Sequence, residues 1–131
     1  QTLVHSQQYI DQEAMGDRIR LVGGDFNCDP LPGKFDIVFL SDILHYQTDA
    51  ENQALFHKLY EATQTGGMIV VKDMFVGEEE PGWNAIFSIH MMVYSEKGRC
   101  FKGSEITTWL QQAGFHEIRT VERNTVLVAM K

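Results

Sequence analysis

The segment Phe35-Asp-Ile-Val-Phe-Leu40 is a dense run of β-forming residues, most of them apolar. Such a run is typical of a strand buried on both faces, as in a parallel sheet, so it predicts a strand over 35–40. A second apolar run, 68–74, follows the turn-forming pair Gly66-Gly67. Between the two runs, residues 49–63 carry apolar side chains at helical spacing: Leu55, Leu59 and Ala62. A strand, a helix and a second strand in this order predict an α/β fold.

The flanking segments continue this alternation of strands and helices. Upstream we predict a helix over 2–15 and a short strand over 19–22. Downstream we predict a helix over 83–94 and a second helix over 105–112, which Ser104 caps and Gly114 ends. We also predict strands over 116–122 and 125–130, joined by a turn at Arg123-Asn124. We therefore expect one partial domain over 1–131, with a mostly parallel sheet and an antiparallel C-terminal hairpin.

Composition excludes several classes of protein. The formal net charge of −7 argues against nucleic acid as a partner, because phosphate binding needs clustered Lys and Arg. No apolar run approaches the roughly 20 residues of a membrane span, and no signal-peptide pattern opens the chain. The two cysteines, Cys28 and Cys100, have no zinc-type spacing and indicate free thiols in a reducing cytoplasm. Residue 1 is Gln1 rather than Met, which suggests a fragment or a processed chain.

Polar residues follow three of the predicted strands. They are Gly24-Asp25-Phe26, the segment Ser41–Tyr46, and Asp73. In open parallel sheets, ligands bind just beyond the carboxyl ends of the strands. We therefore expect these three loops to converge on one ligand site.

Two of these loops suggest particular chemistry. Asp25 could accept from the exocyclic amine of an adenine while Phe26 packs on the ring; alternatively, Asp25 caps a turn and Phe26 belongs to the core. His45 could act as a general base near neutral pH, with Asp73 on its far ring nitrogen. The alternative for His45 is an ordinary surface or packing histidine, and spacing alone leaves both interpretations open.

A third candidate lies in the Met-rich helix predicted over 83–94. His90 and Met91 could face an aromatic substrate, although a core-edge histidine on a packed helix is the alternative. We interpret the remaining histidines, His5, His57 and His116, as surface residues. The sequence contains no GxGxxG, GxxxxGK[ST] or GxSxG motif.

Four segments in order resemble a known enzyme family. The chain is similar to class I S-adenosylmethionine-dependent O-methyltransferases that act on small phenolic or polyketide molecules, a group that includes acetylserotonin-type enzymes. The likeness runs from residue 1 to residue 131 as the C-terminal portion of the catalytic domain. The segments that carry it are Arg18-Ile-Arg-Leu-Val-Gly-Gly-Asp-Phe26, Phe35-Asp-Ile-Val-Phe-Leu-Ser-Asp-Ile-Leu-His45, Thr65-Gly-Gly-Met-Ile-Val-Val-Lys-Asp-Met74 and Gln112-Ala-Gly-Phe115.

The resemblance implies a Rossmann-like sheet, S-adenosylmethionine as cofactor, S-adenosylhomocysteine as product and no metal. It also implies that the family's glycine-rich loop, N-terminal strands and helical dimerisation domain lie upstream of Gln1, and that the full-length protein is a homodimer. A strand absent from this chain would separate 19–22 from 35–40. The roles implied for individual residues are cofactor binding by Gly24, Asp25, Phe26 and Ser41, general-base catalysis by His45 with support from Asp73, and substrate binding by His90 and Met91.

Two residues depart from the family pattern. Tyr46 stands where the family usually has Asp, and Cys100 stands where many members carry a second supporting Glu. The expected function is methyl transfer to a hydroxyl of a small, aromatic acceptor. The two departures motivate a first alternative, a non-catalytic or repurposed member that still binds the cofactor. A second alternative is an NAD-type dinucleotide-binding domain with the same layered sheet.

Overall fold

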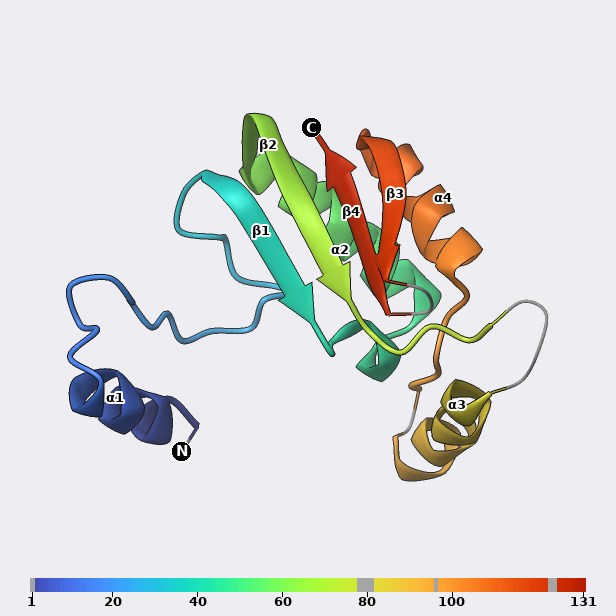
Figure 1. The fold of residues 1–131 in the computed structure, drawn as a ribbon, viewed down its shortest axis with the longest axis horizontal. Coiled ribbons are helices and arrows are strands. Elements are labelled where there is room, and N and C mark those ends of the chain that lie inside the picture. The colour runs from blue at the N-terminus through green and yellow to red at the C-terminus, as the bar shows by residue number, and fades with distance from the viewer. Residues whose placement is uncertain (1, 78–81, 96, 123–124) are drawn as a thin grey trace. The chain divides into compact units, whose positions relative to one another are not determined.

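The computed structural model describes residues 2–77, 82–95, 97–122 and 125–131 (Figure 1). The chain divides into two units, one up to Pro30 and one from Leu31 to Lys131. Of the predicted elements, the turn at Arg123-Asn124 lies outside the described residues.

The first unit contains one helix, α1 (Thr2–Gln12), followed by turns. Ile10 is its buried residue, and the Met15 N–H donates to the Ile10 carbonyl just beyond the helix end. The strand predicted over 19–22 is wrong, because this segment is irregular backbone. A strand exists only with a hydrogen-bonded neighbour, and no described residue pairs with 19–22. Its apolar side chains Ile19 and Val22 are accordingly exposed.

The second unit is built on a four-stranded sheet of order β1-β2-β4-β3. Its strands are β1 (Phe35–Ser41), β2 (Thr63–Lys72), β3 (His116–Glu122) and β4 (Val126–Met130). β1 and β2 are parallel, and β4 runs antiparallel to both β2 and β3. The predicted α/β fold, with a mostly parallel sheet and one antiparallel strand from the C-terminal hairpin, is confirmed.

Helices α2 (Asp49–Ala62) and α4 (Gly103–Ala113) cover one face of this sheet (Figure 1). Their apolar sides form the core with the sheet residues that point toward them, including Leu40, Leu55, Phe56, Ile69, Val71, Ile106 and Leu110. The 3-10 helix η1 (Leu44–Tyr46) joins β1 to α2, and α3 (Trp83–Tyr94) has the predicted bounds. Gly114 ends α4 in the left-handed conformation, at φ 110°, as predicted.

The start of α4 differs from the prediction. The N-cap residue is Lys102 rather than Ser104, so the helix begins two residues before the predicted position. The Lys102 N–H donates to Glu105 Oε2 at 2.8 Å, and this bond closes the first turn. The carboxylate three residues into the helix therefore fixes its start, because it reaches back to the free backbone N–H.

The expectation that β1 is buried on both faces is wrong. Leu40 is 6% exposed, whereas Ile37 and Phe39 are 59% and 63% exposed. The strand alternates because one face packs on the core and the other face does not. β1 also lies at an edge of the sheet, with β2 as its single neighbour among the described strands.

No helix in the described part of the chain is long and apolar enough to span a membrane.

Candidate active site

The carboxyl ends of β1 and β2 meet at one edge of the sheet. Ser41 pairs with Lys72 in the parallel register, and the Asp42 N–H donates to the Lys72 carbonyl at 2.9 Å. The segments that follow these strands therefore begin side by side. This position brings together η1, which carries His45, and Asp73, as the strand order predicts for a ligand site.

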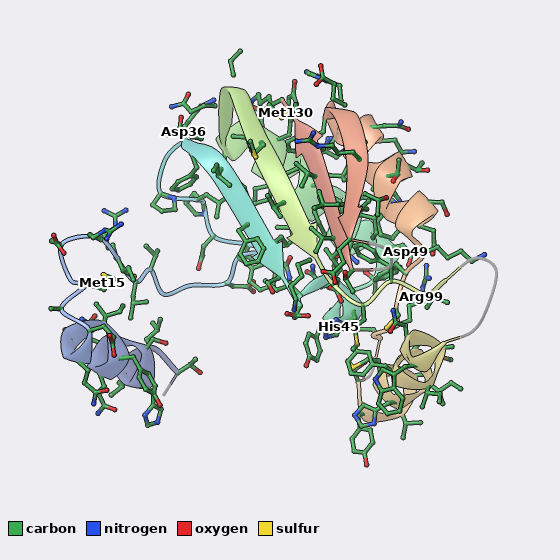
Figure 2. All side chains as sticks on the ribbon, viewed as in Figure 1. Met15, Asp36, His45, Asp49, Arg99 and Met130 are labelled. Atoms are coloured by element: carbon green, nitrogen blue, oxygen red, sulfur yellow. The ribbon has the colours of Figure 1, made fainter. Side chains whose placement is uncertain are left out.

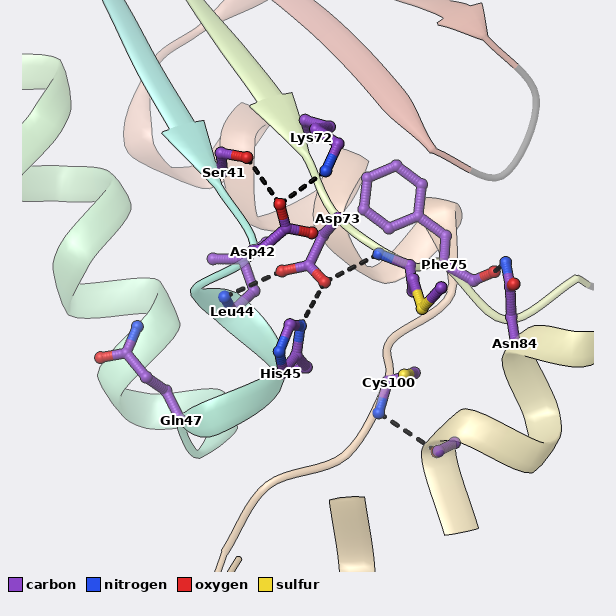
Figure 3. Close-up of polar contacts among 12 residues, drawn as sticks. Ser41, Asp42, Leu44, His45, Gln47, Lys72, Asp73, Phe75, Asn84 and Cys100 are labelled. Carbon is purple, nitrogen blue, oxygen red and sulfur yellow. Dashed lines mark hydrogen bonds and ion pairs between the residues drawn. The ribbon is translucent and has the colours of Figure 1, made fainter. Parts of the chain in front are cut away.

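The centre of the site is a buried pair of side chains, His45 and Asp73 (Figure 3). The Nδ1 atom of His45 lies 2.5 Å from Oδ1 of Asp73, and the two side chains are 5% and 3% exposed. A carboxylate at Nδ1 favours the tautomer that carries its proton there. The other ring nitrogen, Nε2, then keeps the lone pair and is the basic atom of the ring.

The Asp73 carboxylate is fixed by backbone donors as well. Its Oδ2 accepts from the Leu44 N–H at 2.9 Å, and its Oδ1 also accepts from the Met74 N–H at 2.8 Å. A buried carboxylate is costly unless its oxygens are hydrogen-bonded, and these donors meet that requirement. Because Leu44 precedes His45, the same carboxylate holds both the backbone of η1 and the imidazole ring.

Two buried amides support η1 from the side of α2. Asn52, fully buried on α2, donates from Nδ2 to the Leu44 carbonyl at 3.1 Å, and Gln47 donates from Nε2 to Asn52 Oδ1 at 2.9 Å. Sequence analysis missed both residues. The available signal was the position of Asn52 on the apolar side of α2, three residues before Leu55, where a polar side chain needs a partner.

Ser41, Asp42 and Lys72 form a second polar cluster at this edge (Figure 3). Asp42 Oδ2 accepts from Ser41 Oγ at 2.7 Å and from Lys72 Nζ at 2.5 Å. These hydrogen bonds, that from Lys72 first, hold the pKa of the Asp42 carboxyl below its usual range. Asp42 has a left-handed backbone, with φ 54°, a conformation that is uncommon outside glycine and is frequent at ligand sites.

Cys100, one of the two departures from the family pattern, lies buried near the pair His45 and Asp73 (Figure 3). It is 4% exposed, and its backbone N–H donates to Ser88 Oγ at 3.1 Å. Burial raises the pKa of the Cys100 thiol to about 11, and the negative charge of Asp73 acts in the same direction. The thiol is therefore neutral at physiological pH, so it supplies no negative charge to the site.

The other departure, Tyr46, is exposed next to the imidazole. Its ring centroid lies 4.4 Å from that of His45, and the residue is 56% exposed. Tyr46 therefore packs against the histidine ring from the solvent side.

Helix α3 contributes a column of rings that starts at His45. Phe87 meets the His45 ring edge-on at 5.3 Å, His90 stacks on Phe87 at 6.1 Å, and Tyr94 lies 4.3 Å from His90. These three residues recur at helical spacing and share one side of α3. His90 is exposed, whereas Met91 is 4% exposed, so the two candidates for substrate binding lie in different surroundings.

The remaining candidates belong to the first unit. Gly24 has φ 157°, and the Asp25 N–H donates to Asp29 Oδ2 at 2.8 Å. Asp25 Oδ1 accepts from the Asn27 N–H at 2.9 Å, so this carboxylate caps a turn. Phe26 is 41% exposed rather than part of a core.

Among the described residues, no group of three or more His, Cys, Asp or Glu side chains is arranged to hold a metal ion.

Comparison with known proteins identifies the class of this chain. A family model for the O-methyltransferase domain matches residues 2–116. The chain belongs to this family, as the four sequence segments predict.

Individual relatives agree with this assignment. The chain is 31% identical over 116 residues to the tetracenomycin polyketide synthesis 8-O-methyl transferase TcmO of Streptomyces glaucescens. The matched region covers 87% of this chain and 34% of that relative. It is 36% identical over 114 residues to the 3-hydroxy-5-methyl-1-naphthoate 3-O-methyltransferase of Streptomyces sahachiroi, covering 86% of this chain and 33% of that relative. The solved structure of PigF with SAH superposes with a TM-score of 0.84 at 25% identity, covering 95% of this chain and 39% of that one. The chain therefore spans about a third of the length of the curated relatives it matches.

Proposed function

We propose that the intact protein transfers a methyl group from S-adenosylmethionine to a hydroxyl of a small aromatic acceptor, with His45 as the general base. The observation that carries this proposal is the buried contact of 2.5 Å between His45 Nδ1 and Asp73 Oδ1 at the carboxyl edge of the sheet. The membership of the chain in the O-methyltransferase domain family supports the reaction type.

His45 and Asp73 have distinct parts in this mechanism. S-adenosylmethionine, when bound, supplies an electrophilic methyl group and leaves as S-adenosylhomocysteine. Nε2 of His45 takes the proton of the acceptor hydroxyl while the hydroxyl oxygen forms its new bond to carbon. Asp73 keeps the imidazole in the required tautomer and stabilises the positive charge that the ring gains. Removal of a proton by a positioned base contributes roughly 10²- to 10⁴-fold to a rate.

Residues in each of the two units have groups that suit this cofactor. Ser41 offers a hydroxyl at the end of β1, beside the Asp42 carboxylate. In the first unit, Asp25 uses Oδ1 to cap its turn, and we assign its Oδ2 to the exocyclic amine of the adenine, with Phe26 on the ring and Gly24 allowing close approach of the backbone. The relative PigF has a solved structure with SAH, which agrees with this choice of cofactor.

The ring column of α3 supports an aromatic acceptor. Phe87 touches the His45 ring, and His90 and Tyr94 extend the row of rings along α3, so an aromatic acceptor that packs on these rings would lie near the imidazole. We assign His90 to the acceptor side and Met91 to the support behind it. The Streptomyces sahachiroi relative is named for a hydroxynaphthoate, an acceptor of this chemical class.

Replacement of His45 tests the proposal directly. We expect His45→Ala in the intact protein to lower kcat for methyl transfer by roughly 10²- to 10⁴-fold, while the Kd for S-adenosylhomocysteine in calorimetry stays within about twofold. His57→Ala is the matched control, because His57 is an exposed histidine on α2. Full activity in His45→Ala would remove His45 from the mechanism. Cofactor binding by the wild-type protein without methylation of any aromatic acceptor would favour the non-catalytic alternative, and tight binding of NAD would favour the dinucleotide-binding alternative.

The state of the intact protein is a separate proposal. We propose a homodimer that acts in the cytoplasm, and the family resemblance supports this. Sedimentation of the intact protein and its localisation in cell fractions are the measurements that test it.

A further inference from the structure

The segment 97–102 passes beside η1, where Gly98 lies against the backbone of His45. Gly98 is buried, and a methyl group added there would overlap both the His45 carbonyl oxygen and Ser95 Oγ. It would also lie 3.3 Å from the carbonyl carbon of His45. Two backbone segments that are 53 residues apart in the sequence, at His45 and Gly98, therefore approach so closely that only glycine fits between them.

This close approach is a matter of space rather than of backbone conformation. Gly98 is not among the glycines with positive φ, which are Gly24, Gly33, Gly66 and Gly114. An alanine could therefore adopt the backbone of Gly98, and the added methyl group would act only through the contacts that it forces.

The segment is anchored on both sides of Gly98, so it cannot simply move away. Lys97 forms an ion pair with Glu51, and Arg99 donates to both carboxylate oxygens of Asp49 at 3.0 Å (Figure 2). Arg99 also donates to Glu105 Oε1 at 2.8 Å. The next residues, Cys100 and Phe101, are 4% and 2% exposed and belong to the interior.

The backbone of η1 is also held from its inner side. The Leu44 N–H donates to Asp73, and the Leu44 carbonyl accepts from Asn52. His45 therefore lies between these buried hydrogen bonds and Gly98. Any displacement of the His45 carbonyl changes the direction of its side chain, and with it the contact with Asp73.

We propose that Gly98 is a positioning residue for His45: the absence of a side chain at 98 lets the segment 97–102 close on η1 and fixes the imidazole against Asp73. This inference concerns the geometry of His45. Its consequence for methyl transfer rests on the proposed function.

The test compares two glycines of the intact protein, in the variants Gly98→Ala and Gly103→Ala. Gly103 is the matched control, because a methyl group added there meets nothing within 4 Å. The first measurement is the NMR signal of the His45 Nδ1 proton, which is assigned by its loss in His45→Ala. The second is the split between kcat and the KM for S-adenosylmethionine.

We expect Gly98→Ala to shift the Nδ1 proton signal, to speed its exchange with water and to lower kcat about ten- to a hundredfold, with the cofactor KM within about twofold. Gly103→Ala should match the wild type in every measurement. An unchanged proton signal in Gly98→Ala overturns the proposal, and so does a shifted signal with an unchanged kcat. A merely structural role would lower the free energy of unfolding without changing kcat per folded molecule.

Two further points keep the test decisive. If circular dichroism shows that Gly98→Ala does not fold, the variant Ser95→Ala/Gly98→Ala takes its place, because it relieves the overlap with Ser95 Oγ and keeps the overlap with the His45 carbonyl. An unchanged Nδ1 signal in that double variant overturns the proposal. Since the proton signal needs no methyl transfer, it decides the role of Gly98 even if the wild-type protein proves inactive.

Discussion

The Asp73 carboxylate accepts three hydrogen bonds, and we expect its charge to matter for chemistry more than for folding. In Asp73→Asn the side chain keeps its shape, but its amide group no longer favours a proton on His45 Nδ1. We expect kcat for methyl transfer to fall about ten- to a thousandfold, with cofactor affinity retained. Asp36→Asn is the control, because Asp36 lies exposed near the opposite end of β1 (Figure 2). Wild-type kcat in Asp73→Asn would contradict this role.

The two cysteines should differ in reactivity. The pKa of the Cys100 thiol is about 11 against an ordinary value of 9.0, so its thiolate fraction near neutral pH is about 100-fold lower than that of an ordinary thiol. Cys28 is exposed. We expect iodoacetamide at pH 7.5 to label Cys28 fully before Cys100 reacts, as mass spectrometry of tryptic peptides would record. Equal labelling of both residues in the folded protein would show that Cys100 is accessible.

The site residues that follow neighbouring strands were predictable from the sequence. The residues that reach the site only through tertiary packing were not. His45 and Asp73 follow the ends of adjacent parallel strands, so their proximity is predictable from the strand order. Gly98 and Asn52 both contact the backbone of η1. The apolar position of Asn52 signals that its amide needs a partner, but neither residue type nor spacing identifies that partner or the close contact at Gly98. The roles of Gly24, Asp25, Phe26 and Ser41 in cofactor binding stay predictions.

At the scale of elements, the start of α2 combines a capping box with an ion pair. Thr48 Oγ1 accepts from the Glu51 N–H at 3.3 Å, and the Glu51 carboxylate accepts from the Thr48 N–H at 2.8 Å. The same carboxylate pairs with Lys97 on the segment next to Gly98. Glu51 therefore links the start of α2 to the segment 97–102.

This arrangement predicts a pH dependence of stability. The hydrogen bond from Lys97 and those from Thr48 lower the pKa of Glu51 to about 2 from an ordinary value of 4.5. A carboxyl whose pKa is lower in the folded state stabilises that state above the unfolded pKa, and this contribution is lost as the pH falls from about 4.5 through about 2. We expect the free energy of unfolding to fall more steeply over this range in the wild type than in Glu51→Gln. Urea titrations of both proteins check this, with Glu61→Gln, an exposed change on the same helix, as the control. Parallel curves for wild type and Glu51→Gln would contradict the expectation.

Most helices were predictable because their apolar residues recur at helical spacing and their ends carry recognisable residues. α3 has its predicted bounds, and Gly114 ends α4 as expected. β2 begins at Thr63, five residues before the predicted strand. Its pairing with β1 shifts register between Thr63 and Met68, where Gly66 has φ 78°. The strand predicted over 19–22 failed because local sequence cannot supply a neighbouring strand.

At the scale of the whole molecule, the outer face of β1 is an exposed apolar surface on an edge strand. Ile37 and Phe39 are each more than half exposed, and exposed apolar edges favour association. We expect the 131-residue chain to self-associate at micromolar concentration in light scattering, and the variant Ile37→Thr/Phe39→Thr to do so less. Val121→Thr is the control, because Val121 is an exposed apolar residue on β3, at the other edge of the sheet. Equal association of the wild type and the double variant would exclude this surface as the cause.

The strand order also constrains how the sheet can form as the polypeptide is synthesised. β4 lies between β2 and β3, yet it follows both in the sequence, and Val126 comes 54 positions after Lys72. At translation rates of about 5 to 20 residues per second, β4 is synthesised roughly 3 to 11 s after β2, so β2 lacks this neighbour during that time. During this interval a nascent chain presents an open strand edge, which is the kind of surface that ribosome-associated chaperones protect.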